Sequence, residues 1–197
     1  MRYSKDHKAE TRQRVIEVAS KRFRKDGIEA TGLARLMADA ELTHGGFYAH
    51  FSSKDQLVQE SITAAVDSAR DYLVHAVRSA RARGADGMEA IIHAYLRPAH
   101  VKHPELGCAI PSLVAEVGRL SPAIRERLVE IVDALVDLIA SVLPKHLEKE
   151  AAIERSRAIL ASMIGTLQLA RLVTDEEASA TILASGRQAA LALARQA

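Results

Sequence analysis

Apolar residues recur every three to four positions along most of the chain, which is the spacing of an amphipathic helix. In the first segment the apolar stripe holds Val15, Ala19 and Phe23, and charged residues occupy the opposite face. No segment alternates apolar and polar residues between clusters of turn residues, so strands are not expected. The pattern therefore predicts an all-α protein of about nine helices.

Capping residues and breakers indicate where these helices begin and end. Gly27 closes the first helix, and Thr31 and Thr43 are expected to cap the second and third. Ser53 and Gln56 form a capping box that opens a long fourth helix. The predicted helices cover about residues 9–25, a short segment with Leu33, Leu36 and Met37, then 43–51, 53–81, 88–102 with a kink at Pro98, 108–119, 121–143, 149–173 and 176–195, with "HPELG" (103–107) as a linker.

The order of these helices predicts two domains. Residues 1–52 form a small three-helix unit, and residues 53–197 form a larger helical body. The long fourth helix joins the two without a flexible linker. A continuous helix of this kind can transmit movement from one part to the other.

Composition narrows the class of protein. Of the 197 residues 48% are apolar, and the single cysteine excludes an intramolecular disulfide, which favours a reducing cytoplasm. The charged N-terminus does not resemble a secretory signal, and no stretch approaches the roughly 20 apolar residues of a membrane span. We therefore expect a soluble, cytoplasmic protein that uses no cofactor or metal.

Positive charge is concentrated at the N-terminal end. Residues 1–30 carry nine Lys and Arg against five Asp and Glu, whereas residues 61–197 carry sixteen of each. This placement is typical of a chain whose one end meets a polyanion, although a solvated helix face gives the same counts. Arg2, Lys5 and Lys8 could also act as a short basic arm along DNA, or be a disordered terminus without a role.

The segment "THGGFYAHF" (43–51) contains two adjacent glycines in a predicted helix. Each glycine in a helix costs about 1 kcal/mol relative to alanine, so the pair calls for a reason. Three short helices with a tight second turn form a helix-turn-helix pattern, in which the third helix enters the major groove with its N-terminus first. Gly45 and Gly46 would then let the main chain approach DNA. Alternatively, they allow the second helix to cross the third closely.

Lys54 is a second indication, because a cation at the start of a helix opposes the helix dipole. A bound phosphate would satisfy both the lysine and the helix end. The alternative is a lysine that points into water.

The run "GIEATGLARLMADAELTHGGFYAHFSSKDQLV" resembles the DNA-binding signature of the TetR (tetracycline repressor) family of bacterial transcriptional regulators. The resemblance covers about residues 10–60, and "GGFYAHFSSKDQL" is its most distinctive part. It implies phosphate contacts by Tyr48 and Lys54, base-edge contacts near Thr43 to Gly45, and core positions for Phe47 and Phe51. The predicted DNA-binding residues are Thr31, Thr43, His44, Gly45, Gly46, Tyr48, His50 and Lys54.

Three residues depart from the family pattern. Gly32 replaces a usual threonine, and Ala34 stands where a polar side chain often reaches DNA. Glu41 occupies a turn position where the family usually has glycine, so this residue must adopt a positive φ or the turn must differ. These departures concern the operator sequence rather than the fold.

The resemblance also implies that the body encloses a ligand cavity and that the last two helices pair with a second copy. Small residues in "ILASGRQAALALA" would let helices pack closely, in a dimer or in the core of a monomer. Apolar walls with a few polar groups are typical of small-molecule sites, although these residues could equally be core. The predicted ligand-binding residues are Met88, Ile92, His93, Tyr95, Leu96, His100, Cys108, Leu113, Glu116 and Met163.

Cys108 follows Gly107 at a predicted helix start, where the helix dipole favours a thiolate. A thiol sensor of electrophiles or oxidants is therefore an alternative, as is an inert buried cysteine. His100 and His103 lie one turn apart, but two histidines make a weak zinc site.

The sequence thus predicts a homodimeric repressor that binds a palindromic operator and is released by a small-molecule effector. A helical-bundle enzyme is a lower alternative, because the sequence has no pair of Glu-x-x-His motifs and no phosphate loop, GxSxG or HExxH motif. A non-specific architectural DNA binder would need far more charge than +2. We therefore expect no enzymatic activity and no membrane partner.

Overall fold

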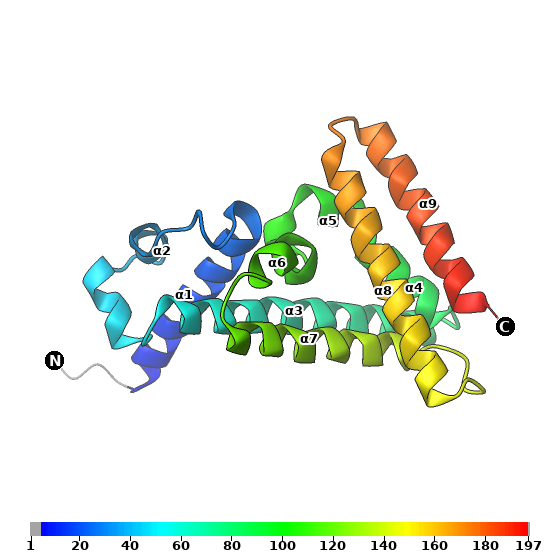
Figure 1. The fold of residues 1–197 in the computed structure, drawn as a ribbon, viewed down its shortest axis with the longest axis horizontal. Helices are drawn as coiled ribbons and strands as arrows, with labels where there is room; N and C mark the ends of the chain where they lie inside the picture. Colours follow the sequence, from blue (N-terminus) through cyan, green and yellow to red (C-terminus); the bar gives the residue numbers. More distant parts are fainter. Residues whose placement is uncertain (1–4, 197) are drawn as a thin grey trace. The chain divides into compact units, whose positions relative to one another are not determined.

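The computed structural model describes residues 5–196, and this part of the chain is helical with no strand (Figure 1). The predicted all-α fold is therefore confirmed, with nine α-helices and two short 3₁₀-helices in the described residues. The elements in order are α1 (Lys5–Asp26), α2 (Leu33–Asp39), η1 (His44–Ala49), α3 (Lys54–Ala82), α4 (Gly87–Tyr95), α5 (Pro98–Lys102), η2 (Pro104–Leu106), α6 (Ala109–Val117), α7 (Pro122–Ala140), α8 (Lys149–Leu172) and α9 (Glu176–Arg195).

The chain forms two compact units. The first unit holds the residues up to Asp67 together with Pro104–Val129, and the second holds Ser68–His103 together with Glu130–Ala197. Helices α3 and α7 therefore each contribute residues to both units. The segment η2–α6 belongs to the first unit, with α1, α2 and η1, although it lies beyond residue 52 in the sequence. The functional division at residues 52 and 53 stays a prediction.

The core of the first unit forms on the apolar stripe of α1. Val15, Ala19 and Phe23 lie four residues apart and are fully or almost fully buried, as the helical spacing predicts. Their side chains share the interior with apolar residues from α2, η1 and the start of α3. These buried partners are Leu36, Met37, Phe47, Phe51, Leu57 and Val58.

Helix α2 ends in a Schellman motif that has no glycine. The amide of Leu42 donates to the carbonyl of Met37 at 2.8 Å, and the amide of Glu41 donates to Ala38 at 3.0 Å. Glu41 occupies the left-handed position of this motif with φ 60°, where glycine is the usual residue. Of the two alternatives for Glu41, the positive φ is the one that the chain adopts.

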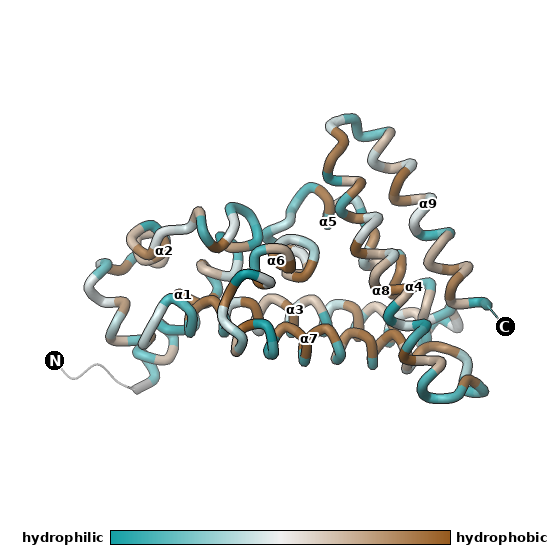
Figure 2. The backbone as a smooth tube through the Cα atoms, viewed as in Figure 1, coloured by the Kyte–Doolittle hydropathy of each residue, from teal (hydrophilic) through white to brown (hydrophobic). Residues whose placement is uncertain are grey.

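The second unit contains an antiparallel hairpin of two long helices, α8 and α9, which lie side by side in Figure 1. The carboxylate of Asp175 caps α9 by accepting the amide of Ala178 at 2.7 Å. Apolar positions recur along α7 and α8 among hydrophilic ones, as Figure 2 shows. The predicted bounds of α8 and α9 agree with the structure to within one residue. Buried hairpin residues are Ile159, Leu160, Met163, Leu167, Ala170, Leu183, Gly186 and Ala190.

Several local predictions were wrong. Residues 88–102 form two helices instead of one kinked helix, because Leu96 ends α4 and Pro98 opens α5 at its first position. Neither Thr31 nor Thr43 caps a helix through its side chain: Gly32 precedes α2, and Thr43 makes no cap hydrogen bond. Part of the predicted linker, residues 104–106, is the 3₁₀-helix η2.

The capping of α3 follows the prediction in its main part. The Oγ of Ser53 accepts the amide of Gln56 at 3.1 Å. The Oε1 of Gln56 accepts the amide of Ser52 at 2.7 Å, one residue earlier than in a standard capping box. Among the described residues, no helix is long and apolar enough to cross a membrane.

Candidate DNA-binding site

The exposed tip of the first unit is formed by the residues that enter η1. Thr43 adopts an extended conformation just before η1, and it is exposed together with His44 and Gly45. Gly46 is half-buried. Because η1 is a 3₁₀-helix of two turns, its first amides have no acceptor within the helix. The tip therefore offers main-chain donors as well as side chains.

The two glycines are not needed for packing inside the protein. A β-carbon at Gly45 would have nothing within 4 Å, and one at Gly46 would lie 3.6 Å from Oγ1 of Thr43 and 3.9 Å from Cε of Met37. The latter are ordinary van der Waals distances, so a close crossing of α2 and η1 does not explain either glycine. Neither glycine has a positive φ. Neither packing nor backbone conformation therefore requires these glycines, and their approach to DNA stays a prediction.

Aromatic side chains divide η1 into an inner and an outer face. Phe47 and Phe51 are buried and stack with their ring centroids 5.5 Å apart. Tyr48 is 68% exposed and packs edge-on against Phe47 at 5.2 Å. The core positions predicted for Phe47 and Phe51 are thus confirmed, and Tyr48 points its ring away from the core.

His50 follows η1 as its C-cap and is surrounded by positive charge. Nε of Arg12 donates to the carbonyl of His50 at 3.3 Å, and the Arg12 guanidinium lies 4.7 Å from the centre of the Phe51 ring. Burial lowers the pKa of His50 below 6.5, and the charges of Lys8 and Arg12 lower it further. The buried Nδ1 of His50 has no hydrogen-bond partner in the structure.

Lys54 does not point into water. Its Nζ donates to the carbonyls of Ile28 and Thr31, each at 2.8 Å, so the amine holds the loop between α1 and α2. A phosphate contact by Lys54 stays a prediction, and it would have to share an amine that already has two acceptors.

Thr31 lies inside the first unit. It is 2% exposed, and its Oγ1 donates to the carbonyl of Gly27 at 2.5 Å. This placement argues against the predicted DNA contact by Thr31. The remaining predicted contacts of the tip stay predictions, since no nucleic acid is part of the structure.

Two arginines that organise this site were missed by the sequence analysis. Arg12 forms an ion pair with Glu60 at 2.5 Å, and Arg22 of α1 pairs with Asp39 of α2 at 2.7 Å. The hydrogen bonds that Arg22 donates to Asp39 and, to a smaller extent, to Asp26 raise the pKa of Arg22. Glu60 and Asp39 are distant in sequence from these arginines, so no local pattern could have indicated the two ion pairs; only the pair of Arg22 with Asp26 has helical i,i+4 spacing. Of the predicted basic arm, Arg2 lies outside the described residues. Lys8 is exposed on α1.

The predicted ligand-binding residues do not all belong to one unit. Cys108, Leu113 and Glu116 lie in the first unit, and the other seven lie in the second. The carboxylate of Glu116 is occupied by amides of the α1–α2 loop, and His93 is exposed. A role of these residues in ligand binding stays a prediction. The buried residues of this set are Met88, Ile92, Tyr95, Leu96, His100, Cys108, Leu113 and Met163.

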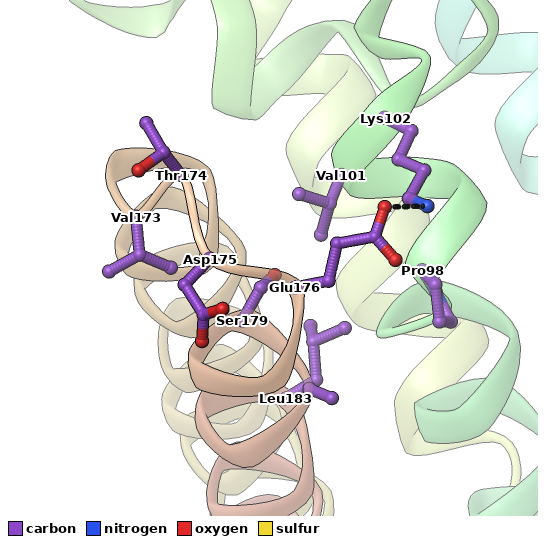
Figure 3. Close-up of a pocket in the computed structure, with 10 residues that line it drawn as sticks. Pro98, Val101, Lys102, Val173, Thr174, Asp175, Glu176, Ser179 and Leu183 are labelled. Carbon is purple, nitrogen blue, oxygen red and sulfur yellow. Dashed lines mark hydrogen bonds and ion pairs between the residues drawn. The ribbon is translucent and has the colours of Figure 1, made fainter.

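Two hollows lie within the second unit. One, of about 300 Å³, has apolar walls that include Val101 and Leu183, and the ion pair between Lys102 and Glu176 (2.6 Å) lies at its edge (Figure 3). The other, of about 400 Å³, is lined in part by the predicted residue Met88. His100 Nδ1 lies 2.7 Å from the carbonyl of Tyr95, and no group of three metal-ligating side chains occurs in the described chain.

The segment that is similar to a known protein family includes the tip. Residues 15–61 match the model of the bacterial regulatory proteins of the tetR family. The HTH-type transcriptional regulator TtgR of Pseudomonas putida is 35% identical over 79 residues, which are 40% of this chain and 37% of TtgR. AcrR of Shigella flexneri is 36% identical over 59 residues, 30% of this chain and 27% of AcrR. The chain thus aligns with well under half the length of these curated relatives.

Solved structures extend the similarity to the whole chain at the level of the fold. A TetR transcriptional regulator from Chloroflexus aurantiacus superposes with a TM-score of 0.77 at 24% identity, covering 97% of this chain and 98% of that one. SCO4454, a TetR-family regulator from Streptomyces coelicolor, has a TM-score of 0.75 at 24% identity over 95% and 91%. Residues 15–61 are thus similar to the DNA-binding domain of the tetR family, and the chain as a whole has the fold of these solved TetR-family regulators.

Proposed function

We propose that this protein is a transcriptional repressor that binds a palindromic DNA operator as a homodimer and leaves it when a small-molecule effector binds. The observation that carries the proposal is the exposed tip at 43–46, where Gly45 has open space on its outer side. Main-chain amides at the start of a helix are suited to phosphate oxygens. A side-chain-free position beside them lets the backbone itself approach the groove.

Contacts to DNA would be divided between the tip and the outer face of η1. Thr43 and His44 are exposed at the end that would enter the major groove, and they carry hydrogen-bonding groups for base edges. Tyr48 presents its hydroxyl from an exposed ring, which suits a phosphate. Because Phe47 of η1 and Phe51, two residues after its end, are both buried in the core, these groups would be held in position before DNA binds.

A second copy would bind through the hairpin of α8 and α9. Leu169 and Leu172 are large apolar side chains on α8 that are more than half exposed, which supports a surface that becomes covered in an assembly. Two copies would place two tips on successive half-sites, about 34–36 Å apart along the duplex. A short recognition element would gain specificity in this way.

Release by an effector needs only a modest coupling between ligand binding and DNA binding. Coupling free energies of about 1–3 kcal/mol are typical, and they change operator affinity by about 5- to 150-fold. The buried apolar residues of the second unit, among them Ile92 and Met163, are the candidates to contact such a ligand.

The test is selection of duplexes from a random-sequence pool by the purified protein, followed by affinity measurements at several salt concentrations. We expect enrichment of a palindrome, a stoichiometry of two chains per site by sedimentation, and an affinity that falls steeply with salt. Equal affinity for random DNA at every salt concentration would contradict specific recognition. Turnover of a substrate by the purified protein would instead favour the enzyme alternative.

A thiol sensor is the second candidate function. Cys108 is buried as the N-cap of α6, and Arg24 donates a hydrogen bond to the carbonyl of the adjacent Gly107. Arg24 interacts electrostatically with Cys108, and a nearby cation is typical of reactive cysteines, whereas burial is typical of inert ones. If Cys108 is the sensor, an electrophile will release DNA from the wild type and not from Cys108→Ser. Release from both proteins would exclude it.

A further inference from the structure

The loop between α1 and α2 binds a carboxylate from a distant helix. The amides of Ile28 and Glu29 both donate to Oε2 of Glu116 on α6, at 2.8 and 3.2 Å. Two consecutive amides that converge on one oxygen form an anion-binding concavity of the backbone. Glu116 fills this concavity from within the same compact unit.

Gly27 makes room for this carboxylate. Its φ is 89°, which turns the chain at the end of α1 so that the next amides face α6. A β-carbon at Gly27 would lie 2.9 Å from Oε1 of Glu116. A side chain at position 27 would therefore be strained and would also press on the carboxylate.

The opposite side of the loop is held by a cation. Nζ of Lys54, at the start of α3, donates to the carbonyls of Ile28 and Thr31 at 2.8 Å each. Ile28 is thus fixed through its amide by Glu116 and through its carbonyl by Lys54. The loop leads directly into α2, which packs against η1.

Helix α6 is also attached at its other end. Arg24, near the end of α1, donates to the carbonyl of Gly107, just before α6, and to the carbonyl of Ser20 at 3.0 Å. Burial lowers the pKa of Arg24, while the charges of Cys108 and Glu105 act in the opposite direction. Arg24 and Glu116 therefore hold the two ends of α6 to the end of α1 and the loop after it.

We propose that Glu116 is a positioning residue for DNA binding: its carboxylate latches α6 to the α1–α2 loop and so holds α2 and η1 in the arrangement that reads DNA. This inference rests on the proposed function, because it concerns the same DNA-binding site. Helix α6 would then be part of the DNA-binding unit, and the partner of Glu116 would be the α1–α2 loop instead of a small-molecule ligand. A movement of α6 that breaks the latch releases the loop from one of its two anchors.

The experiment compares Glu116→Ala and Glu116→Gln with the control Glu126→Gln, which removes an exposed carboxylate from α7 in the same unit. Amide hydrogen exchange at Ile28 and Glu29 reports the latch, and affinity for the duplex selected by the wild type reports positioning. We expect Glu116→Ala to raise exchange at these two amides and to weaken DNA binding, each by about tenfold. Glu116→Gln keeps an acceptor oxygen and should recover part of both losses.

The outcomes separate this inference from the proposed function. A folded Glu116→Ala variant that binds DNA like the wild type overturns the positioning role, and so does an equal loss of affinity in Glu126→Gln. Wild-type amides of Ile28 and Glu29 that exchange as fast as in an unfolded chain overturn the latch even if no variant folds. A wild-type protein that binds no duplex overturns the proposed function.

Discussion

Gly186 on α9 faces Thr166 on α8 at a distance that leaves no room for a side chain. A β-carbon at Gly186 would lie 2.1 Å from Cγ2 and 2.6 Å from Cβ of Thr166. The Cβ of a threonine cannot move by a change of rotamer, so the two helix backbones would have to separate. This contact sets how closely the hairpin packs.

We therefore predict that Gly186→Ala lowers the free energy of unfolding by about 1–3 kcal/mol, as overpacking of a core does. Gly165 on α8 is the matched control, because a β-carbon there would have nothing within 4 Å. Gly165→Ala should raise stability by up to about 1 kcal/mol through helix propensity. Urea unfolding of both variants checks the pair, and equal effects would contradict this account of the hairpin.

The bounds of this hairpin could be predicted because its signals are local. Asp175 caps α9 through a carboxylate three residues from the amide that it accepts, and Pro144 lies in the turn between α7 and α8. The break between α4 and α5 was missed because Pro98 suits both a kink and a first helical turn. Leu96 is fully buried, and its burial favours ending α4 where the chain turns. Burial of that kind depends on residues far away in sequence.

A second prediction concerns Gly45 at the exposed tip. Gly45→Ala should leave stability unchanged or raise it by up to about 1 kcal/mol, since a β-carbon there meets open space. Affinity for the selected operator should fall by about tenfold or more if the main chain lies against DNA. Fluorescence anisotropy with a labelled duplex checks this, and Glu126→Gln, at an exposed position of α7, serves as the control with no change in affinity. If Gly45→Ala binds the operator with unchanged affinity, close approach of the main chain to DNA does not explain this glycine.

A third prediction follows from Glu41 and Gly84, which occupy the same position of the same motif. At the end of α3 the amides of Ala85 and Gly84 donate to Ala80 and Arg81, as the amides of Leu42 and Glu41 do at the end of α2. Gly84 has φ 69° and Glu41 has φ 60°. A left-handed conformation costs an L-residue about 1–2 kcal/mol and costs glycine little.

Glu41→Gly should therefore stabilise the protein by about 1 kcal/mol, and Gly84→Ala should destabilise it by a similar amount. Glu41→Ala removes the charge but keeps the β-carbon, so it should give none of the gain. Thermal unfolding of the three variants checks the prediction. A gain in Glu41→Ala equal to that in Glu41→Gly would assign the effect to charge instead of backbone conformation.

The candidate site was predictable only in its local part. The exposed tip and the buried Phe47 and Phe51 follow from spacing within a few residues, whereas the positive φ of Glu41 was one of two alternatives that the family pattern raised. The partners of Lys54 and Glu116 are backbone groups of one loop, and such contacts leave no pattern in side-chain identity. A sequence shows which side chains are charged, whereas the fold decides which carbonyls and amides they reach.

The last prediction concerns the titration of His50. Its folded pKa is lowered below 6.5, first by burial and then by Lys8 and Arg12. The unfolded chain therefore takes up this proton before the folded chain as pH falls. Above pH 6.5 His50 is neutral in both states, and its titration costs no stability. As the pH falls from 6.5 toward the lower pKa of His50 in the folded protein, the free energy of unfolding decreases. Wild-type protein should lose more stability over this range than His50→Gln.

The effect of nearby charges on His50 can be tested by NMR titration of its imidazole. Lys8→Gln should raise its pKa toward 6.5, whereas Lys21→Gln, which removes an exposed charge elsewhere on α1, should leave it unchanged. A DNA phosphate near the ring would stabilise the imidazolium, so the selected duplex should raise the pKa in the wild type. This change would place His50 at the DNA surface, where the resemblance to the TetR family predicts it. A pKa that DNA leaves unaltered would assign His50 to the support of η1, because its ring would then lie too far from the phosphates to sense their charge.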